Sequence, residues 1–180
     1  MTVPDLTGTV DQVACRLLGH LLVTDFGART VLAIEEVEAY GGADDPASHA
    51  YRGATARNAS MFGPAGTLYV YRSYGIHWCA NIATGQAGDG QAVLLRGGRV
   101  VEGLETVVRR RGRTDHLADG PGKLTQALGI SGDHDGTSVF GGPVRLEPGP
   151  EPPPASIRAT PRIGITREVD RPWRFMVASS

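Results

Sequence analysis

Three glutamates and a tyrosine end an otherwise apolar run at residues 31–40, which reads VLAIEEVEAY. A carboxylate that leaves water for an apolar site costs several kcal/mol unless it is paired or neutralised. Alternation along a strand puts Glu38 and Tyr40 on one face and Glu35 on the other. Glu38 could therefore be a general base at a rigid strand end, beside an aromatic ring. The alternative is a strand that leaves the core with its acids in solvent.

Aromatic and arginine side chains alternate in the middle of the chain. Tyr69 and Tyr71 share one strand face, and Tyr74 falls at the tip of an expected hairpin, where core packing does not require it. Rings interleaved with guanidinium groups suit base stacking and phosphate contact, although ordinary amphipathic tyrosines and solvated arginines would give the same local pattern. The residues of this pattern are Tyr51, Arg52, Arg57, Tyr69, Tyr71, Arg72 and Tyr74.

Metal ligation is not expected. His49, His77 and Cys79 match no zinc spacing, and two of the three lie in one expected strand. The two cysteines, Cys15 and Cys79, are expected to be free thiols because no secretory signal is apparent at the N-terminus.

The elements that must position these residues form an irregular series without regular β-α alternation. A helix is expected at 10–21 from the spacing of its apolar residues, and a strand at 29–40. A long turn-rich connection at 41–66 is of the kind that is usually functional or disordered. The remaining expected elements are a hairpin at 66–84, a strand at 91–101, helices at 102–112 and 120–130, a hairpin at 137–149 and strand-like runs at 161–178. This order predicts a mixed α+β fold with a largely antiparallel sheet.

Length and composition are those of one ordinary globular domain, residues 1–180, with 41% hydrophobic and 21% charged residues. No apolar run is long enough to span a membrane, and a cytoplasmic protein is expected. The charge is uneven, because residues 46–123 carry ten bases against five acids. A basic middle segment permits a phosphate-binding face without requiring one.

Five segments, in order and with compatible spacing, resemble the alkyladenine (3-methyladenine) DNA glycosylase family. They read EEVEAYGGADDPASHAYRG, ARNASMFGPAGTLYVYRSYGIHWCANI, GQAVLLRGG with EGLE, DGPGKLTQALGI and PRIGITREVDRPWRF. The resemblance implies a single-domain α+β fold with a curved, open-barrel-like antiparallel sheet and flanking helices. It also implies a DNA repair enzyme that flips alkylated or deaminated purines out of double-stranded DNA. Such an enzyme hydrolyses the N-glycosidic bond and leaves an abasic site.

The family motif assigns the chemistry to the strand end first noted above. Glu38 matches the general base that activates water, and Arg96 matches an arginine near that water and the lesion's backbone. Tyr40 and Tyr71 match the two rings that enclose the flipped base. The resemblance implies no metal and no cofactor, and it requires no dimer, so a monomer is expected.

Three further positions carry over from the family. His49 matches a histidine that contacts the flipped base, Asn81 an asparagine that obstructs the 2-amino group of normal guanine, and Tyr74 the residue that fills the gap in the stack. The chain has Ala56 where the family has proline, which should loosen that loop. The basic residues expected to contact the DNA backbone are Arg52, Arg57, Arg72 and Lys123.

Two alternatives remain open at this point. A bifunctional glycosylase would use a lysine Schiff base, for which Lys123 is the single lysine of the chain. A non-catalytic nucleic-acid or metabolite-binding module on the same fold, akin to formyltransferase-type domains, would have no need of Glu38.

Overall fold

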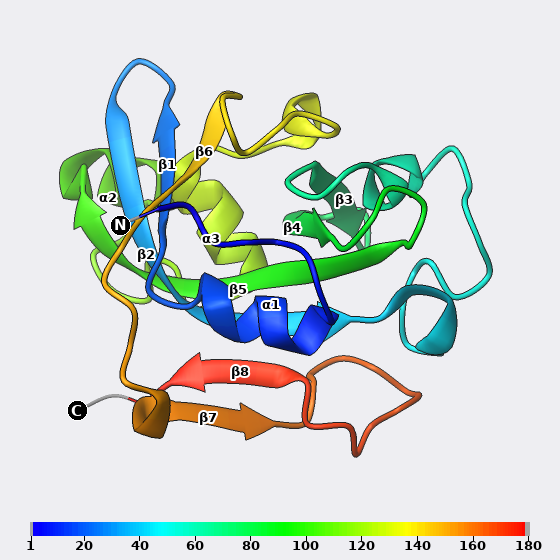
Figure 1. Ribbon diagram of the computed structural model, residues 1–180. Coiled ribbons are helices and arrows are strands. Elements are labelled where there is room, and N and C mark those ends of the chain that lie inside the picture. The colour runs from blue at the N-terminus through cyan, green and yellow to red at the C-terminus, as the bar shows by residue number, and fades with distance from the viewer. Residues whose placement is uncertain (1, 179–180) are drawn as a thin grey trace.

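The computed structural model describes residues 2–178, and within them eight strands form one curled antiparallel sheet (Figure 1). Six strands follow the order β3-β4-β5-β2-β1-β6, while β8 pairs with β2 and β7. The predicted α+β class is therefore confirmed. The strands are β1 (Leu21–Asp25), β2 (Arg29–Tyr40), β3 (Leu68–Ser73), β4 (His77–Thr84), β5 (Gln91–Glu102), β6 (Val144–Glu147), β7 (Ile157–Thr160) and β8 (Arg174–Val177).

Strand β2 is the centre of the sheet and has the predicted bounds. Its first half pairs with β1, from Arg29 to Ala33, and its second half pairs with β8, from Glu36 to Glu38. Along its other edge it pairs with β5, with register shifts on both sides of Glu36. The end of β2 is thus held between two strands that come from distant parts of the chain.

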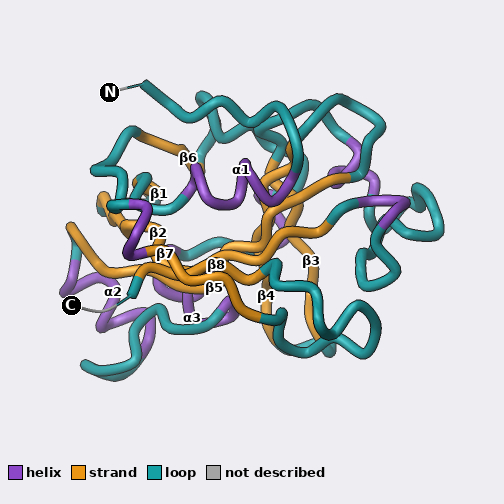
Figure 2. Tube along the Cα trace, turned by 60° about the horizontal axis from the view of Figure 1, so that its bottom comes forward, coloured by secondary structure: helices purple, strands orange, loops and turns teal. Residues whose placement is uncertain are grey.

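Three α-helices cover the sheet within the described residues: α1 (Val10–Leu17), α2 (Leu104–Arg111) and α3 (Pro121–Leu128). Helix α1 packs on β2 and β5, and α3 packs on β4 and β5. Figure 2 shows α1 on one side of the sheet and α2 and α3 on the other. Apolar side chains of α1 and α3 join those of the strands in one core.

The first helix is shorter than predicted, and the prediction of 10–21 was wrong at its end. Helical geometry stops at Leu18, and Gly19 turns the chain with φ +84°. A Cβ at Gly19 would lie 2.2 Å from the Pro150 carbonyl oxygen, so this close turn requires glycine. The apolar residues that follow belong instead to β1, which the helical spacing concealed.

The predicted hairpin at 66–84 is confirmed by the pairing of β3 with β4. The hairpin predicted at 137–149 was wrong as a paired unit, because one backbone hydrogen bond, from the Leu146 N–H to the Val139 carbonyl, joins its halves and each half pairs mainly with another segment. Residues 137–139 exchange backbone hydrogen bonds with residues 66–68, and β6 pairs with β1. Local turn residues indicated a reversal here but could not indicate which strand each half would join.

The long connection at 41–66 is ordered by side chains rather than by a sheet or a long helix. It contains two short 3₁₀ helices, Gly42–Asp44 and Ala59–Phe62. Asn58 is buried and accepts hydrogen bonds from Thr55 while donating to the carbonyls of His49 and Gly53. This network fixes the loop beside the ends of β2 and β3.

Candidate active site

A cavity of about 820 Å³ opens where the end of β2, the β3–β4 hairpin and the first half of β5 meet the 41–66 loop and the segment 163–167. Both polar and aromatic side chains line it. Of the predicted site residues, only Lys123 is not among its lining residues. The predicted residues that line it are Glu38, Tyr40, His49, Arg52, Arg57, Tyr71, Arg72, Tyr74, Asn81 and Arg96.

Glu38 lines this cavity from the end of β2 and is wholly buried, with 0% of its surface exposed. Its Oε2 accepts a hydrogen bond from the Tyr40 hydroxyl at 2.8 Å, and its Oε1 accepts one from the Ile163 backbone N–H at 2.7 Å. The Nη1 of Arg96 lies 3.5 Å from Oε2. Both oxygens of the buried carboxylate thus have donors, as the cost of burying such a group requires.

Glu36 forms a second acidic position beside Glu38. Its Oε1 accepts hydrogen bonds from Nε of Arg96 at 2.9 Å and from Nε of Arg174 at 2.7 Å. Burial raises the pKa of Glu36, but the two arginines outweigh burial and the net shift is downward. Glu36 is thus the ion-pair partner of the predicted site residue Arg96. Glu35 points elsewhere and pairs with Arg99.

Three aromatic rings form one wall of the cavity. Tyr69 and Tyr71 stack with ring centroids 5.4 Å apart, and His49 meets Tyr71 edge-on at 4.6 Å. Burial is the first cause that raises the pKa of Tyr69, to about 12, so its hydroxyl keeps its proton. That hydroxyl lies 3.1 Å from Nδ1 of His49. Burial, followed by Arg57, lowers the pKa of His49, which favours a neutral ring that accepts this hydrogen bond.

Tyr40 stands against a cation that the sequence did not single out. The guanidinium carbon of Arg162 lies 4.7 Å from the Tyr40 ring centroid and 5.5 Å from that of Trp173. The Arg162 side chain is fully buried and pairs with both oxygens of Asp45, at 2.5 and 2.9 Å. Burial and then the Glu38 carboxylate raise the pKa of the Tyr40 phenol.

The Arg162–Asp45 pair was missed because hydrophobic periodicity does not distinguish a buried arginine from a solvated one. Arg162 lies in the segment PRIGITREVDRPWRF, which is one of the five that resemble the family. The residue types of that segment did not indicate a role for Arg162. In the fold, Arg162 immediately precedes Ile163, whose N–H contacts Glu38. The pair therefore fixes the segment that supplies one hydrogen bond to the carboxylate.

Asn81 lies on the strand next to the aromatic wall. It is buried, and its Nδ2 donates to the backbone carbonyl of Tyr69 at 3.1 Å. This bond orients the amide, which belongs to a residue that lines the cavity. A rigid polar group at a pocket wall can discriminate between bases by shape.

The tip of the β3–β4 hairpin stands at the mouth of the cavity. Tyr74 is 91% exposed and Ile76 is 66% exposed. Tyr74 and Gly75 both have positive φ, 50° and 67°, and the Ile76 N–H donates to the Ser73 carbonyl at 3.0 Å. A tyrosine in this conformation carries backbone strain, which in folded proteins concentrates at functional sites.

The basic residues near the cavity differ in their partners. Arg52 and Arg57 are exposed on the 41–66 loop, and the Arg72 guanidinium lies over the Trp78 ring at 5.4 Å. Lys123, in contrast, pairs with Asp119 at 3.0 Å. Arg167, which the sequence did not single out, lines the cavity from the segment 163–167.

Two further structural observations bear on cofactors and membranes. Across residues 2–178, no three His, Cys, Asp or Glu side chains are grouped so that they could hold a metal ion. Over the same residues, no helix has both the length and the apolar character needed to cross a membrane.

Cys15 and Cys79 are free cysteines, as expected from the sequence.

The side chains that line the cavity are suited to bind a flat, electron-poor ring and to catalyse a reaction beside it. Stacked tyrosines favour a cationic aromatic ligand, and a buried carboxylate with fixed hydrogen bonds can accept a proton or stabilise an adjacent positive charge. The exposed arginines at the mouth suit a polyanion.

Known proteins are similar in sequence to this chain over almost its whole length. The family model for methylpurine-DNA glycosylase (MPG) matches residues 5–180. A protein of Nocardia farcinica is 49% identical over 190 residues, which cover 100% of this chain and 88% of the relative. One of Methanoculleus marisnigri is 51% identical over 173 residues, with 93% and 90% covered. One of Granulibacter bethesdensis is 50% identical over 184 residues, with 99% and 85% covered.

All three relatives are named provisionally as 3-methyladenine DNA glycosylases. The match spans every segment that lines the cavity, from the end of β2 to residue 167. The chain therefore belongs to the methylpurine-DNA glycosylase family and is a DNA glycosylase of DNA repair, an enzyme that hydrolyses N-glycosidic bonds.

Proposed function

We propose that the enzyme takes an alkylated or deaminated purine, of the 3-methyladenine, 7-methylguanine or hypoxanthine type, out of duplex DNA into the cavity. Glu38 then activates the water that hydrolyses the N-glycosidic bond, and an abasic site remains. The observation that carries this proposal is the placement of Glu38: a buried carboxylate with fixed hydrogen bonds in a cavity walled by aromatic rings. A site that only bound DNA would have no use for a carboxylate near phosphates.

Selection of the lesion follows from the rings. Alkylation at N3 or N7 gives a purine a positive charge, which makes the base a better leaving group and a better partner for electron-rich rings. Tyr40 and Tyr71 would each favour a cationic base by roughly 0.5–2 kcal/mol. Extrusion costs a few kcal/mol and least for a weakly paired base, so extrusion itself adds selectivity.

The chemical step is hydrolysis at C1′ through an oxocarbenium-like transition state. The bond from C1′ to the purine nitrogen breaks, and the base leaves with both electrons. The oxygen of water forms the new bond to C1′, and Glu38 takes the proton that this water loses. The same carboxylate stabilises the developing positive charge on the sugar. Arg96, 3.5 Å from Glu38, stands where it can orient the water.

Extrusion leaves a gap in the stack that another group must fill. Tyr74 is suited to this because it is almost fully exposed and fixed at a tight turn. Arg52, Arg57 and Arg72 surround the same opening and would contact the backbone, where phosphate contacts supply much of the affinity.

Strand cleavage through a Schiff base would need an amine at C1′. Lys123 pairs with Asp119 and does not line the cavity. This supports a monofunctional enzyme over the bifunctional alternative.

The substitution Glu38→Gln tests the proposal, because it keeps the shape of the side chain and removes its charge. We expect the single-turnover release of 3-methyladenine from alkylated duplex DNA to fall about 10²- to 10⁴-fold, while affinity for the lesion duplex largely survives. Glu35→Gln is the matched control on the same strand, since Glu35 contacts Arg99 and not the cavity. Wild-type rates in Glu38→Gln would exclude Glu38 as the base.

A further inference from the structure

One guanidinium is shared by two carboxylates at the end of β2. The Nε of Arg96 donates to Glu36 at 2.9 Å, whereas its Nη1 stands 3.5 Å from Glu38. A charge-assisted N–H···O bond is ordinarily 2.7–2.9 Å long. Arg96 therefore makes a hydrogen bond of normal length to Glu36 through Nε, and only a longer contact with Glu38 through Nη1.

Glu36 is held from both sides by the strands that flank β2. Arg96 reaches it from β5 and Arg174 reaches it from β8, and both donate to the same oxygen. All three charged side chains are mostly buried, between 13% and 20% exposed.

We propose that Glu36 and Arg174 are positioning residues that together set how closely Arg96 engages Glu38. By engaging Nε, Glu36 keeps the Arg96 guanidinium from closing into a full ion pair with Glu38, and Arg174 limits how strongly Glu36 attracts Arg96. The inference rests on the proposed role of Glu38 as the base. It adds that the way the Arg96 guanidinium is shared between Glu36 and Glu38 decides how readily Glu38 takes a proton from water.

The physical reason is competition for one cation. An arginine that forms a full, two-bonded pair with a carboxylate stabilises its charged form and occupies the side from which water would approach. Without Glu36, Arg96 would have Glu38 as its remaining acidic partner. Without Arg174, Glu36 would have Arg96 as its remaining cationic partner and would draw it away from Glu38.

Other titratable and charged groups surround Glu38 and remain unchanged in the test that follows. They come from β2 itself, from the β3 and β4 strands of the hairpin, and from the segment that follows β7. These groups are Tyr40, Tyr71, Cys79 and Arg162.

The test compares Glu36→Gln with Arg174→Gln in single-turnover hydrolysis of a 7-methylguanine duplex across pH, with the enzyme-free rate subtracted. The leaving base is already cationic, so the acid limb of the profile reports the essential base alone. In Glu36→Gln the limb should move to lower pH by roughly half a unit to one unit, and in Arg174→Gln it should move to higher pH by a similar amount. The plateau rate of Glu36→Gln should also fall several-fold.

A conservative variant separates charge from position. Glu36→Asp keeps the charge but shortens the reach to the two arginines, so its plateau rate should fall while its acid limb moves less than that of Glu36→Gln. Glu35→Gln is again the control and should leave both the limb and the plateau unchanged. Thermal unfolding of each variant shows that the rates come from folded protein.

Opposite shifts exclude a merely structural role, which would lower rates without moving the two limbs in opposite directions. The loss of plateau rate in Glu36→Asp, which keeps the charge, then distinguishes a displaced Arg96 from the direct effect of a lost charge, and an unchanged plateau in that variant would overturn the positioning role. Unmoved limbs, or limbs that move the same way in both variants, would overturn the inference. These outcomes are distinct from a failure of the proposed function, which Glu38→Gln reports separately. An inactive Glu38→Gln enzyme with unmoved limbs in the other two variants would leave Glu38 as the base and remove Glu36 and Arg174 from the mechanism.

Discussion

The end of β2 and the tip of the β3–β4 hairpin line the same cavity but are built in opposite ways. At the end of β2, Glu38 is wholly buried and every oxygen has a donor. At the tip, Tyr74 is almost fully exposed and sits in a strained backbone conformation. At the end of β2 the hydrogen bonds of the carboxylate are satisfied within the protein itself. At the hairpin tip the exposed side chains could be covered only by another molecule.

This difference assigns different tasks to the two regions. A pre-organised carboxylate suits chemistry because its surroundings need not reorganise during the reaction. Exposed rings and guanidinium groups suit the capture of a large polyanion. Substitutions at the end of β2 should therefore change stability and rate, and substitutions at the tip should change DNA binding.

The largest expected effect on stability belongs to the ion pair beneath Tyr40. Arg162→Met leaves Asp45 buried without its main partner and should lower the free energy of unfolding by about 3–5 kcal/mol. Urea unfolding measures this loss. Arg113→Met breaks an exposed pair with Asp115 of similar length and should have little effect. An Arg162→Met protein as stable as the wild type would mean that the region is less tightly built than its contacts indicate.

The same pair gives the stability a defined pH dependence. Burial raises the pKa of Asp45, but the hydrogen bonds from Arg162 and Gly41 outweigh it and lower the pKa overall. The contribution of Asp45 is then fully present above the ordinary aspartate value of about 4 and is lost as pH falls below it. The gap in stability between wild type and Arg162→Met should narrow in acid.

The tip should show the converse behaviour. Tyr74→Ala should weaken binding to a lesion duplex by about 1–3 kcal/mol, the usual worth of one stacked aromatic. Its unfolding free energy should change by less than about 0.5 kcal/mol, because the ring contacts little of the folded chain. Fluorescence anisotropy and urea unfolding give the two values. Unchanged affinity for the lesion duplex would remove Tyr74 from the stack-filling role.

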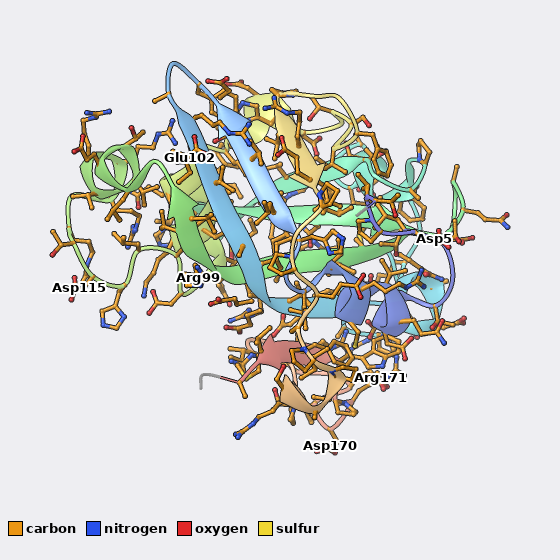
Figure 3. All side chains as sticks on the ribbon, turned by 60° about the vertical axis from the view of Figure 1, so that its left-hand side comes forward. Asp5, Arg99, Glu102, Asp115, Asp170 and Arg171 are labelled. Atoms are coloured by element: carbon orange, nitrogen blue, oxygen red, sulfur yellow. The ribbon has the colours of Figure 1, made fainter. Side chains whose placement is uncertain are left out.

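The smallest effect is expected at the arginines of the cavity mouth. Arg57→Ala should weaken binding to lesion and undamaged duplexes alike, and should reduce the salt dependence of log K by about 0.9 if it loses one phosphate contact. Arg99→Ala serves as control, because Arg99 lies exposed on β5 (Figure 3) and does not line the cavity. An unchanged salt dependence of log K in Arg57→Ala would mean that Arg57 does not contact a phosphate of the DNA.

Short-range patterns predicted much of the fold. The bounds of β2, the hairpin at Tyr74-Gly75 and the helix that ends at Gly129 follow from alternation, turn residues and stop signals that act within a few positions. The errors arose where a segment's partner is remote. Strand β1 carries apolar residues that also fit a helical period, and the two halves of residues 137–149 share one backbone hydrogen bond but pair mainly with other segments.

The sequence by itself determined that Glu38 and Tyr40 stand two positions apart on one strand, since alternation allows them to meet on one side. Only the tertiary structure decided what surrounds them. Arg96 lies 60 residues from Glu36, and Ile163 lies 125 residues from Glu38. Spacing along a strand specifies which side chains share a face, but the partners across the sheet depend on which distant strands pair with that edge. Those pairings place the donors that make a buried carboxylate stable and useful.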